Sequence, residues 1–211
     1  MYVNYIKRFF DVSLALMALI VLSPVLLIVA IAIKIESPGP AIFKQTRLGR
    51  YGTPFEIYKF RSMCLNAENQ GSRQYSFKND PRVTKVGRFI RATSIDELPQ
   101  LVNILRGDMS LIGFRPPLTY HPWPFEEYTE EQKRMFELRP GVTGWAQIHG
   151  RKDVLWEDRI KMGIYYVDNV SFLLDLRIFF ATIWKVLSNA DNENTGVTVQ
   201  QKQESQNTNA K

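Results

Sequence analysis

The chain has few of the residues that form disulfides and zinc sites. Its 211 residues include one cysteine, Cys64, and two histidines, His121 and His149. A single cysteine excludes a disulfide within the chain, and so few soft ligands make a structural zinc site improbable. A metal, if the chain uses one, is therefore expected to be a hard cation bound by oxygen ligands. The sequence shows no internal repeat.

Charge is absent from one long stretch, Val12 to Ile33, whose only polar side chains are Ser13 and Ser23. About 22 residues rising about 1.5 Å each would extend roughly 33 Å, enough for a hydrocarbon core of about 30 Å. Pro24 lies near the middle, where it removes a backbone hydrogen bond and bends the helix. Ser23 can satisfy a carbonyl that this bend frees. The pattern predicts a helix, a break and a second helix.

Basic residues flank this stretch on both sides, and the positive-inside rule places such residues in the cytoplasm. Lys7 and Arg8 precede it, and Lys34 follows it. We therefore expect residues 1–36 to form a re-entrant anchor that returns to the same face. A kinked single span is the open alternative. A cleaved signal peptide is disfavoured, because the apolar core is too long and no small-residue cleavage site follows it.

The rest of the chain is large enough for one ordinary domain, which we place at 37–187. The expected fold is α+β and mostly helical, with a small cytosolic catalytic domain carrying interfacial amphipathic helices. The tail at 188–211 has no periodicity and is expected to be disordered. The elements expected between these limits are extended segments at 41–44 and 54–60, a polar surface loop at 66–81, an amphipathic helix over 98–105, a charged helix over 126–138, and a helix over 156–166.

Residues 171–187 are strongly apolar but contain the charges of Asp175, Arg177 and Lys185. These charges make a deep membrane span unlikely to be stable. A helix at the membrane interface, with Trp184 at the level of the headgroups, and a buried core helix both fit the pattern.

The adjacent carboxylates of Asp96 and Glu97 are the leading candidates for chemistry. Two neighbouring side chains point in different directions, so one can attack while the other holds a metal or a proton. The surroundings are cationic, with Arg88 and Arg115 nearby in sequence, which favours ionised carboxylates and attracts phosphates. The alternative is a capping box, in which Ser94 and Glu97 only begin a helix. Pro99 argues for a distorted first turn instead.

Two further arginines follow rigid or glycine-rich turns. Arg115 precedes two prolines, and Arg151 follows Gly150. The planar fork of a guanidinium matches a phosphate, so arginines fixed in this way favour a diphosphate site. With the net charge of +6, the expected partners are anionic: phosphorylated substrates, lipid headgroups or nucleic acid.

Four segments in order resemble the signatures of the bacterial sugar transferases, which are monotopic polyprenol-phosphate phosphoglycosyltransferases. They are KFRSM (59–63), TSIDELPQ (93–100), SLIGFRP (110–116) and RPGVTGWAQIHGR (139–151). The hydrophobic helix broken at Ser-Pro is similar too, so the resemblance covers about residues 5–187. The chain resembles the short form of the family, and residues 165–179 resemble the members that load N,N'-diacetylbacillosamine 1-phosphate.

The resemblance implies a two-step reaction at the cytoplasmic face of the bacterial inner membrane. Asp96 would attack the β-phosphate of a UDP-sugar and release UMP, and undecaprenyl phosphate would then accept the phosphosugar. Glu97 would assist as base or metal partner, Mg²⁺ would bind at Asp96, and the phosphates would be held by Arg115 and Arg151. Arg88, from the cationic surroundings of the Asp96-Glu97 pair, is a third candidate phosphate ligand. Phe114 and His149 depart from the usual proline and asparagine.

Other functions stay open at this stage. A non-catalytic adaptor could use the same basic surface to bind anionic membrane lipid. A nucleic-acid-binding protein is disfavoured, because the cations lie beside a membrane anchor without interleaved aromatic residues. The donor sugar, the glycan pathway and a homo-oligomeric state are not fixed by these patterns.

Overall fold

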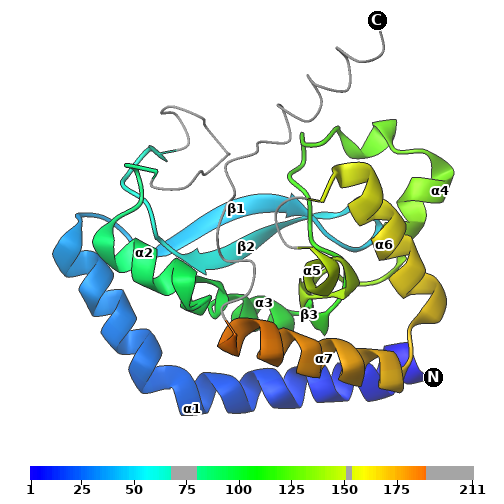
Figure 1. Cartoon of the computed structure of the whole chain (residues 1–211), viewed down its shortest axis with the longest axis horizontal. Coiled ribbons are helices and arrows are strands. Elements are labelled where there is room, and N and C mark those ends of the chain that lie inside the picture. The colour runs from blue at the N-terminus through cyan, green and yellow to red at the C-terminus, as the bar shows by residue number, and fades with distance from the viewer. Residues whose placement is uncertain (68–79, 151–153, 189–211) are drawn as a thin grey trace, which may run out of the picture.

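The computed structural model describes residues 1–67, 80–150 and 154–188. Most of the expected polar loop, the disordered tail and Arg151 therefore lie outside the described residues. The fold is α+β and mostly helical, as predicted (Figure 1). Its helices are α1 (Lys7–Glu36), α2 (Lys85–Ala92), α3 (Gln100–Arg106), α4 (Glu130–Lys133), α5 (Trp145–His149), α6 (Trp156–Asn169) and α7 (Phe172–Leu187), and its strands are β1 (Ile42–Leu48), β2 (Pro54–Phe60), β3 (Ser110–Ile112) and β4 (Gly141–Thr143).

Helix α1 is long, apolar and bent into two arms (Figure 1). Pro24 lies inside it, and the hydroxyl of Ser23 donates a hydrogen bond of 2.8 Å to the carbonyl of Ile20. The predicted break at Ser23 and Pro24 is thus a bend in a helix that continues on both sides. By length and composition α1 could cross a membrane. A single span and a re-entrant anchor both fit these properties.

Both arms of α1 pack against the rest of the protein. The first arm places Ala15 in a core with Ile57 and Ile104. The second arm places Ile33 in another core with Ile90. Since the apolar stretch exceeds what these contacts need, side chains such as Ile20 and Leu27 remain more than half exposed.

Polar contacts hold both ends of α1. The carboxylate of Asp11 accepts hydrogen bonds from the hydroxyl of Ser110 (2.7 Å) and the backbone N–H of Leu111 (2.9 Å). At the other end, the carboxylate of Glu36 accepts bonds from the N–H groups of Lys85 (2.7 Å) and Val86 (2.9 Å), in the first turn of α2. These N–H groups have no partner within their own helix, so Glu36 satisfies them.

The two sheets are small. Strands β1 and β2 form an antiparallel hairpin, which confirms the two predicted extended segments. Strands β3 and β4 run parallel, with Ser110 opposite Gly141 and Ile112 opposite Thr143. The backbone segments that follow the two strands approach closely. A Cβ added to Gly144 would lie 1.8 Å from the carbonyl oxygen of Gly113.

The prediction of a single charged helix over 126–138 is wrong. Helix α4 spans only Glu130–Lys133 and continues into a 3-10 turn, Arg134–Glu137, while a separate 3-10 turn covers Phe125–Glu127. The side chain of Thr129 caps α4, so the helix begins there. The following turn tightens because Met135 and Phe136 are both buried, and Phe136 meets Phe114 with ring centres 5.1 Å apart.

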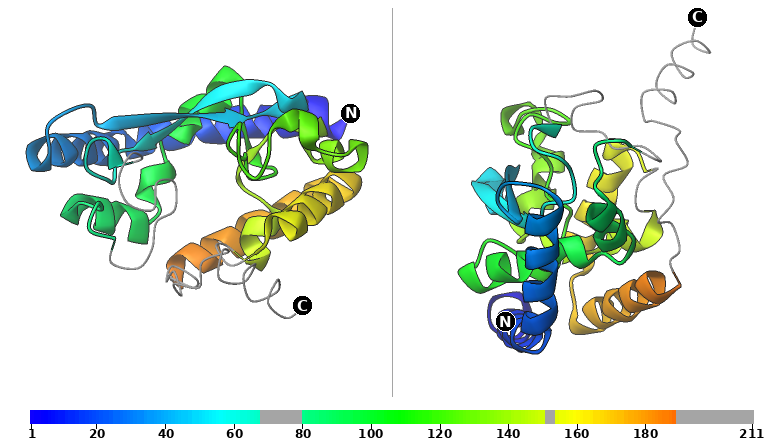
Figure 2. Two further views of the ribbon diagram at one scale, coloured as in Figure 1. Left: turned by 90° about the horizontal axis from the view of Figure 1, so that it is seen from above. Right: turned by 90° about the vertical axis from the view of Figure 1, so that its left-hand side faces the viewer.

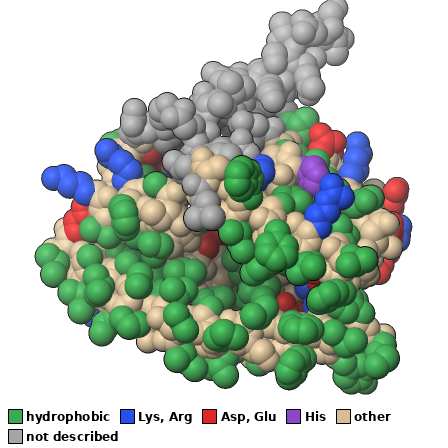
Figure 3. Space-filling view, turned by 60° about the horizontal axis from the view of Figure 1, so that its bottom comes forward, with side chains coloured by type: hydrophobic (Ala, Val, Ile, Leu, Met, Phe, Trp, Pro, Cys, Tyr) green, Lys and Arg blue, Asp and Glu red, His purple; other side chains and the backbone are tan. Residues whose placement is uncertain are grey.

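Helix α7 buries one narrow stripe and exposes most of its apolar side chains. Ile178 is fully buried, whereas Leu173 is 75% and Trp184 is 73% exposed. In Figure 1 and in the right-hand view of Figure 2, α7 and the first arm of α1 both lie at the bottom of the molecule. Seen from that side, hydrophobic side chains cover the surface and most charges lie near its edges (Figure 3). This exposure favours the interfacial helix over the buried core helix.

Candidate active site

Asp96 and Glu97 lie on a short 3-10 turn, Ile95–Glu97, between α2 and α3. Ser94 before it has a left-handed backbone (φ 58°) and makes no capping hydrogen bond, while Pro99 stands at the N-cap of α3. The capping-box alternative is therefore wrong. The two carboxylates belong to a separate turn, as the position of Pro99 predicted.

Two cations from other segments reach Glu97. The ammonium of Lys59, on β2, lies 2.8 Å from Glu97 Oε1. The guanidinium of Arg115, just beyond β3, lies 3.9 Å from the same oxygen. The structure thus brings Glu97 and Arg115 together, as the sequence suggested, and adds Lys59.

Asp96 is in a different environment from its neighbour. Burial, and after it the negative charge of Glu97, raise the pKa of Asp96 from 3.8 to about 6. The positive charges of Lys59, Arg91 and Arg115 oppose this rise. Asp96 is consequently a half-buried carboxylate that is mostly ionised near neutral pH. Three cations lie close enough to act on its charge.

The arginines of α2 have distinct positions. Arg91 donates from Nε to the hydroxyl of Ser62 at 2.8 Å, and burial lowers the pKa of its guanidinium. Arg88 lies one turn earlier and is exposed. Arg106, at the end of α3, lies over the ring of Tyr58, with its guanidinium carbon 5.1 Å from the ring centre.

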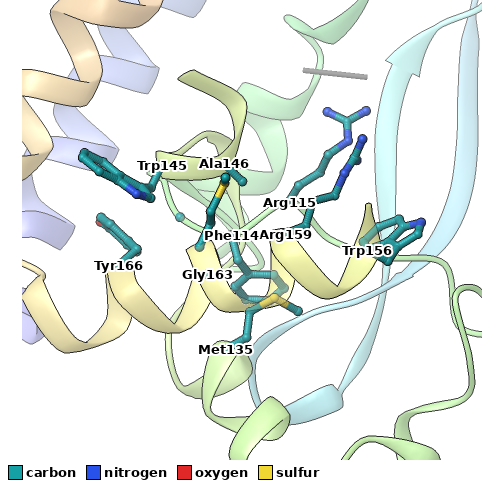
Figure 4. A pocket seen from close by; sticks show the side chains of 11 residues that line it. Phe114, Arg115, Met135, Trp145, Ala146, Trp156, Arg159, Gly163 and Tyr166 are labelled. Atoms are coloured by element: carbon teal, nitrogen blue, oxygen red, sulfur yellow. The ribbon is translucent and has the colours of Figure 1, made fainter. Parts of the chain in front are cut away.

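A pocket opens beside Arg115, at the carboxyl ends of the parallel strands β3 and β4 (Figure 4). Ligands commonly bind at this edge of parallel strands. In Figure 4 the side chain of Arg159, from α6, lies alongside that of Arg115, and both point the same way. The pocket is lined by Gly113, Phe114, Arg115, Met135, Trp145, Ala146, Trp156, Arg159, Met162, Gly163 and Tyr166.

Lys59 and Arg159 were not predicted as site residues. Lys59 stands in the KFRSM segment, so its place in a signature was an available signal. Its contact with Glu97 depends on how β2 lies beside the turn, which no local pattern reveals. Arg159 stands in an ordinary amphipathic helix, and nothing in its spacing distinguishes it from a solvated cation.

The donor set suits a hard cation that is shared with a ligand. Among residues 1–67, 80–150 and 154–188, no group of three or more histidine, cysteine, aspartate or glutamate side chains could enclose a metal. Asp96 and Glu97 supply two adjacent carboxylates. Mg²⁺ commonly binds through one or two carboxylates and the phosphates of a substrate, so the pair fits that mode of binding and no fuller protein cage.

Comparison with known proteins shows the family of the chain. The family model for bacterial sugar transferases matches residues 2–189. The chain belongs to this family. The family to which the four segments pointed is thereby confirmed, and the chain is a polyprenol-phosphate sugar transferase by descent.

Three similar relatives illustrate the range of the family. The sugar transferase EpsL of Bacillus subtilis is 45% identical over 86% of this chain and 87% of its own length. The UDP-glucose:undecaprenyl-phosphate glucose-1-phosphate transferase of Escherichia coli is 43% identical over 85% of this chain and 40% of its own. The UDP-N-acetylgalactosamine-undecaprenyl-phosphate N-acetylgalactosaminephosphotransferase of Aeromonas hydrophila is 44% identical over 87% of this chain and 44% of its own. The chain thus spans most of the first relative and less than half of the other two.

Proposed function

We propose that this transferase moves a sugar 1-phosphate from a UDP-sugar to undecaprenyl phosphate. A carboxylate oxygen of Asp96 attacks the β-phosphorus of the donor, the bond from that phosphorus to the bridging oxygen breaks, and UMP leaves. An oxygen of undecaprenyl phosphate then attacks the phosphorus of the aspartyl phosphosugar, which frees Asp96 and forms a lipid-linked diphosphosugar. Such a product suits the first membrane step in the assembly of a capsule, exopolysaccharide, O-antigen or protein glycan.

The observation that carries this proposal is the environment of Asp96. It is a half-buried carboxylate beside Glu97, under the charges of Lys59, Arg91 and Arg115. These cations keep a nucleophilic carboxylate ionised near neutral pH and attract the diphosphate that it attacks. Glu97, held by Lys59 at 2.8 Å, is positioned to assist as a base or as a metal partner.

The arginines have separate expected roles. Arg115 lies at the pocket beside Glu97 and is proposed to bind the donor's phosphates. Arg88 is exposed on α2, and Arg151 lies outside the described residues. Both stay proposed phosphate ligands. When bound through Asp96 and the donor's phosphates, Mg²⁺ would neutralise diphosphate charge.

We further propose that α1 is re-entrant and that the catalytic domain lies on the cytoplasmic face of the inner membrane. Both arms of α1 contact this domain, and Asp11 and Glu36 bind it at the two ends of the helix. The exposed apolar side chains of α7 supply a second contact with lipid. This placement suits the reaction, since a polyprenol phosphate keeps its head at the membrane surface and a UDP-sugar is soluble in the cytoplasm.

The donor sugar is not fixed by the relatives. Their names specify glucose in E. coli and N-acetylgalactosamine in A. hydrophila, at nearly the same identity to this chain. The bacillosamine-type donor suggested by residues 165–179 stays a prediction. A panel of UDP-sugars, assayed for UMP release, distinguishes these donors.

The test of the reaction is UMP release by purified protein supplied with UDP-sugar, Mg²⁺ and undecaprenyl phosphate. Asp96→Asn is expected to abolish release, because the amide cannot attack phosphorus. The matched control is Asp158→Asn, which removes a half-exposed carboxylate paired with Lys161 and should leave release unchanged. Release that survives in Asp96→Asn would exclude Asp96 as the nucleophile. An adaptor that only binds membranes would release no UMP from any donor.

A further inference from the structure

Arg159 is fixed in position at the start of α6. Its Nε donates a hydrogen bond of 2.9 Å to the carbonyl of Val154, and its guanidinium carbon lies 5.0 Å from the centre of the Trp156 ring. The indole N–H of Trp156 donates in turn to Nε2 of His121 at 2.9 Å. These contacts order the guanidinium in advance, so little conformational entropy is lost when it binds an anion.

Several positive charges meet at this place. Arg115 and Arg159 line one pocket and extend side by side (Figure 4). The pKa of His121 is lowered by burial and then by the charges of Arg47 and Arg159, so a third guanidinium is also close. Parallel guanidinium groups repel one another, and a ligand with more than one anionic group relieves that repulsion.

The residues follow one another in a definite order. Asp96 and Glu97 share a turn, Arg115 lies 3.9 Å from Glu97, and Arg159 lies beside Arg115 (Figure 4). Trp156, which also lines the pocket, lies against the guanidinium of Arg159. This order offers two successive guanidinium groups to the second phosphate of a donor whose β-phosphorus faces Asp96.

We propose that Arg159 binds the nucleotide-side phosphate of the donor, with Trp156 holding it in place, whereas Arg115 binds the phosphate that is transferred. The inference rests on the proposed function and adds a division of labour to it. When the bond to the bridging oxygen breaks, its electron pair goes to the phosphate of the departing UMP. Arg159 stabilises that charge in the first half of the reaction and has no part in the second.

The test uses UMP and UDP as probes, with purified protein in detergent and no acceptor present, and measures affinity by calorimetry. Arg159→Met should weaken UMP and UDP alike by at least about tenfold, the effect of losing a charge-assisted hydrogen bond. Arg115→Met should weaken UDP more than UMP. Lys161→Met removes an exposed cation two residues further along α6 and should change neither affinity.

Arg159→Lys guards against a folding defect, because it keeps the charge and loses only the fork. Its affinity for UMP should lie between those of wild type and Arg159→Met, with the same melting temperature as wild type. In rapid quench of the two half-reactions, Arg159→Met should slow UMP release and leave transfer from the aspartyl intermediate unchanged.

Two outcomes would overturn the assignment while the proposed function stands. One is a wild-type protein that releases UMP together with an Arg159→Met variant that binds UMP within twofold of it. The other is a variant that slows both half-reactions equally, which indicates a structural role for Arg159. A wild-type protein that neither releases nor binds UMP would instead contradict the proposed function itself.

Discussion

The neighbouring carboxylates of Asp96 and Glu97 differ in their surroundings, because other segments of the chain contact them differently. Glu97 has the ammonium of Lys59 at 2.8 Å, which fixes the position of its carboxylate. Asp96 is affected more by burial and by the charge of Glu97, so its pKa rises to about 6. Two residues of similar chemistry can thereby perform different tasks, one as nucleophile and the other as its partner.

The first prediction concerns the pH dependence of UMP release. Protonated Asp96 cannot attack, so kcat/KM for the donor should fall as the pH drops through about 6, the raised pKa of Asp96. In Glu97→Gln the like charge is gone, the pKa of Asp96 falls, and the acid limb of the residual activity should move to lower pH. Glu130→Gln, at an exposed surface pair, should leave the limb where it is. An unmoved limb in Glu97→Gln would mean that another group controls it.

The second prediction is a shift of the acid limb in the opposite direction, to higher pH. Lys59 opposes the rise in the pKa of Asp96. Replacing it in Lys59→Met should raise that pKa and move the acid limb to higher pH, and Lys59→Arg should keep the limb close to that of wild type. The same titration of kcat/KM measures all three proteins. A shift to lower pH in Lys59→Met would contradict the proposed electrostatics of the turn.

At the scale of elements, the sequence predicted what depends on local pattern. The bend at Pro24, the hairpin strands and the separate turn of Asp96 each follow from nearby residues, and each is present. The break within 126–138 was missed, because the burial of Phe136 is decided by Phe114 far away in sequence. The parallel pairing of β3 with β4 was missed for a similar reason, since three-residue strands leave no periodic signal.

The third prediction tests the close approach beyond this parallel pair. In Gly144→Ala the new methyl group would fall 1.8 Å from the carbonyl oxygen of Gly113, whose backbone leads into Arg115. The two backbone segments must move apart, at a cost of about 1–3 kcal/mol in the free energy of unfolding. UMP release should fall as Arg115 shifts. Thermal unfolding in detergent and the release assay check the two effects. A variant with wild-type stability and activity would contradict this prediction and show that the two backbone segments separate at little cost.

The fourth prediction concerns the buried polar cluster where α7 meets α1. Asp175 accepts hydrogen bonds from Lys7 (2.9 Å), Tyr2 (2.6 Å) and Tyr166 (2.6 Å). Asp175→Leu would leave the ammonium of Lys7 buried, with the carboxylate of Asp11 at 3.9 Å as its remaining ion-pair partner among the described residues. We expect a loss of about 3–5 kcal/mol in the free energy of unfolding, measured by thermal or chemical unfolding in detergent.

A matched variant separates this effect from the general loss of an ion pair. Glu130→Gln removes a surface pair with Lys133, in which the glutamate side chain is 91% exposed. Its effect should be below about 1 kcal/mol. Equal losses in Asp175→Leu and Glu130→Gln would show that the buried cluster contributes nothing specific to the docking of α7 on α1.

At the scale of the whole molecule, the question is how α1 meets the membrane. A span would carry the two ends of the helix to opposite faces of the bilayer. Asp11 and Glu36, near those ends, bind to β3 and to α2 of the same domain, and both arms contribute to its cores. A span would have to break one set of these contacts and expose buried polar groups to lipid, which is costly.

The last prediction follows from this connection. In a Cys64→Ser background, Tyr5→Cys and Tyr51→Cys place single thiols before and after α1, where the native side chains are 73% and 63% exposed. In intact cells, a thiol reagent that cannot cross the inner membrane should label neither position, and both should react once the membrane is permeabilised. A single span would place the two positions on opposite sides, so exactly one of them would be labelled from outside. Because each variant is its own control after permeabilisation, labelling of either one in intact cells would exclude the re-entrant anchor.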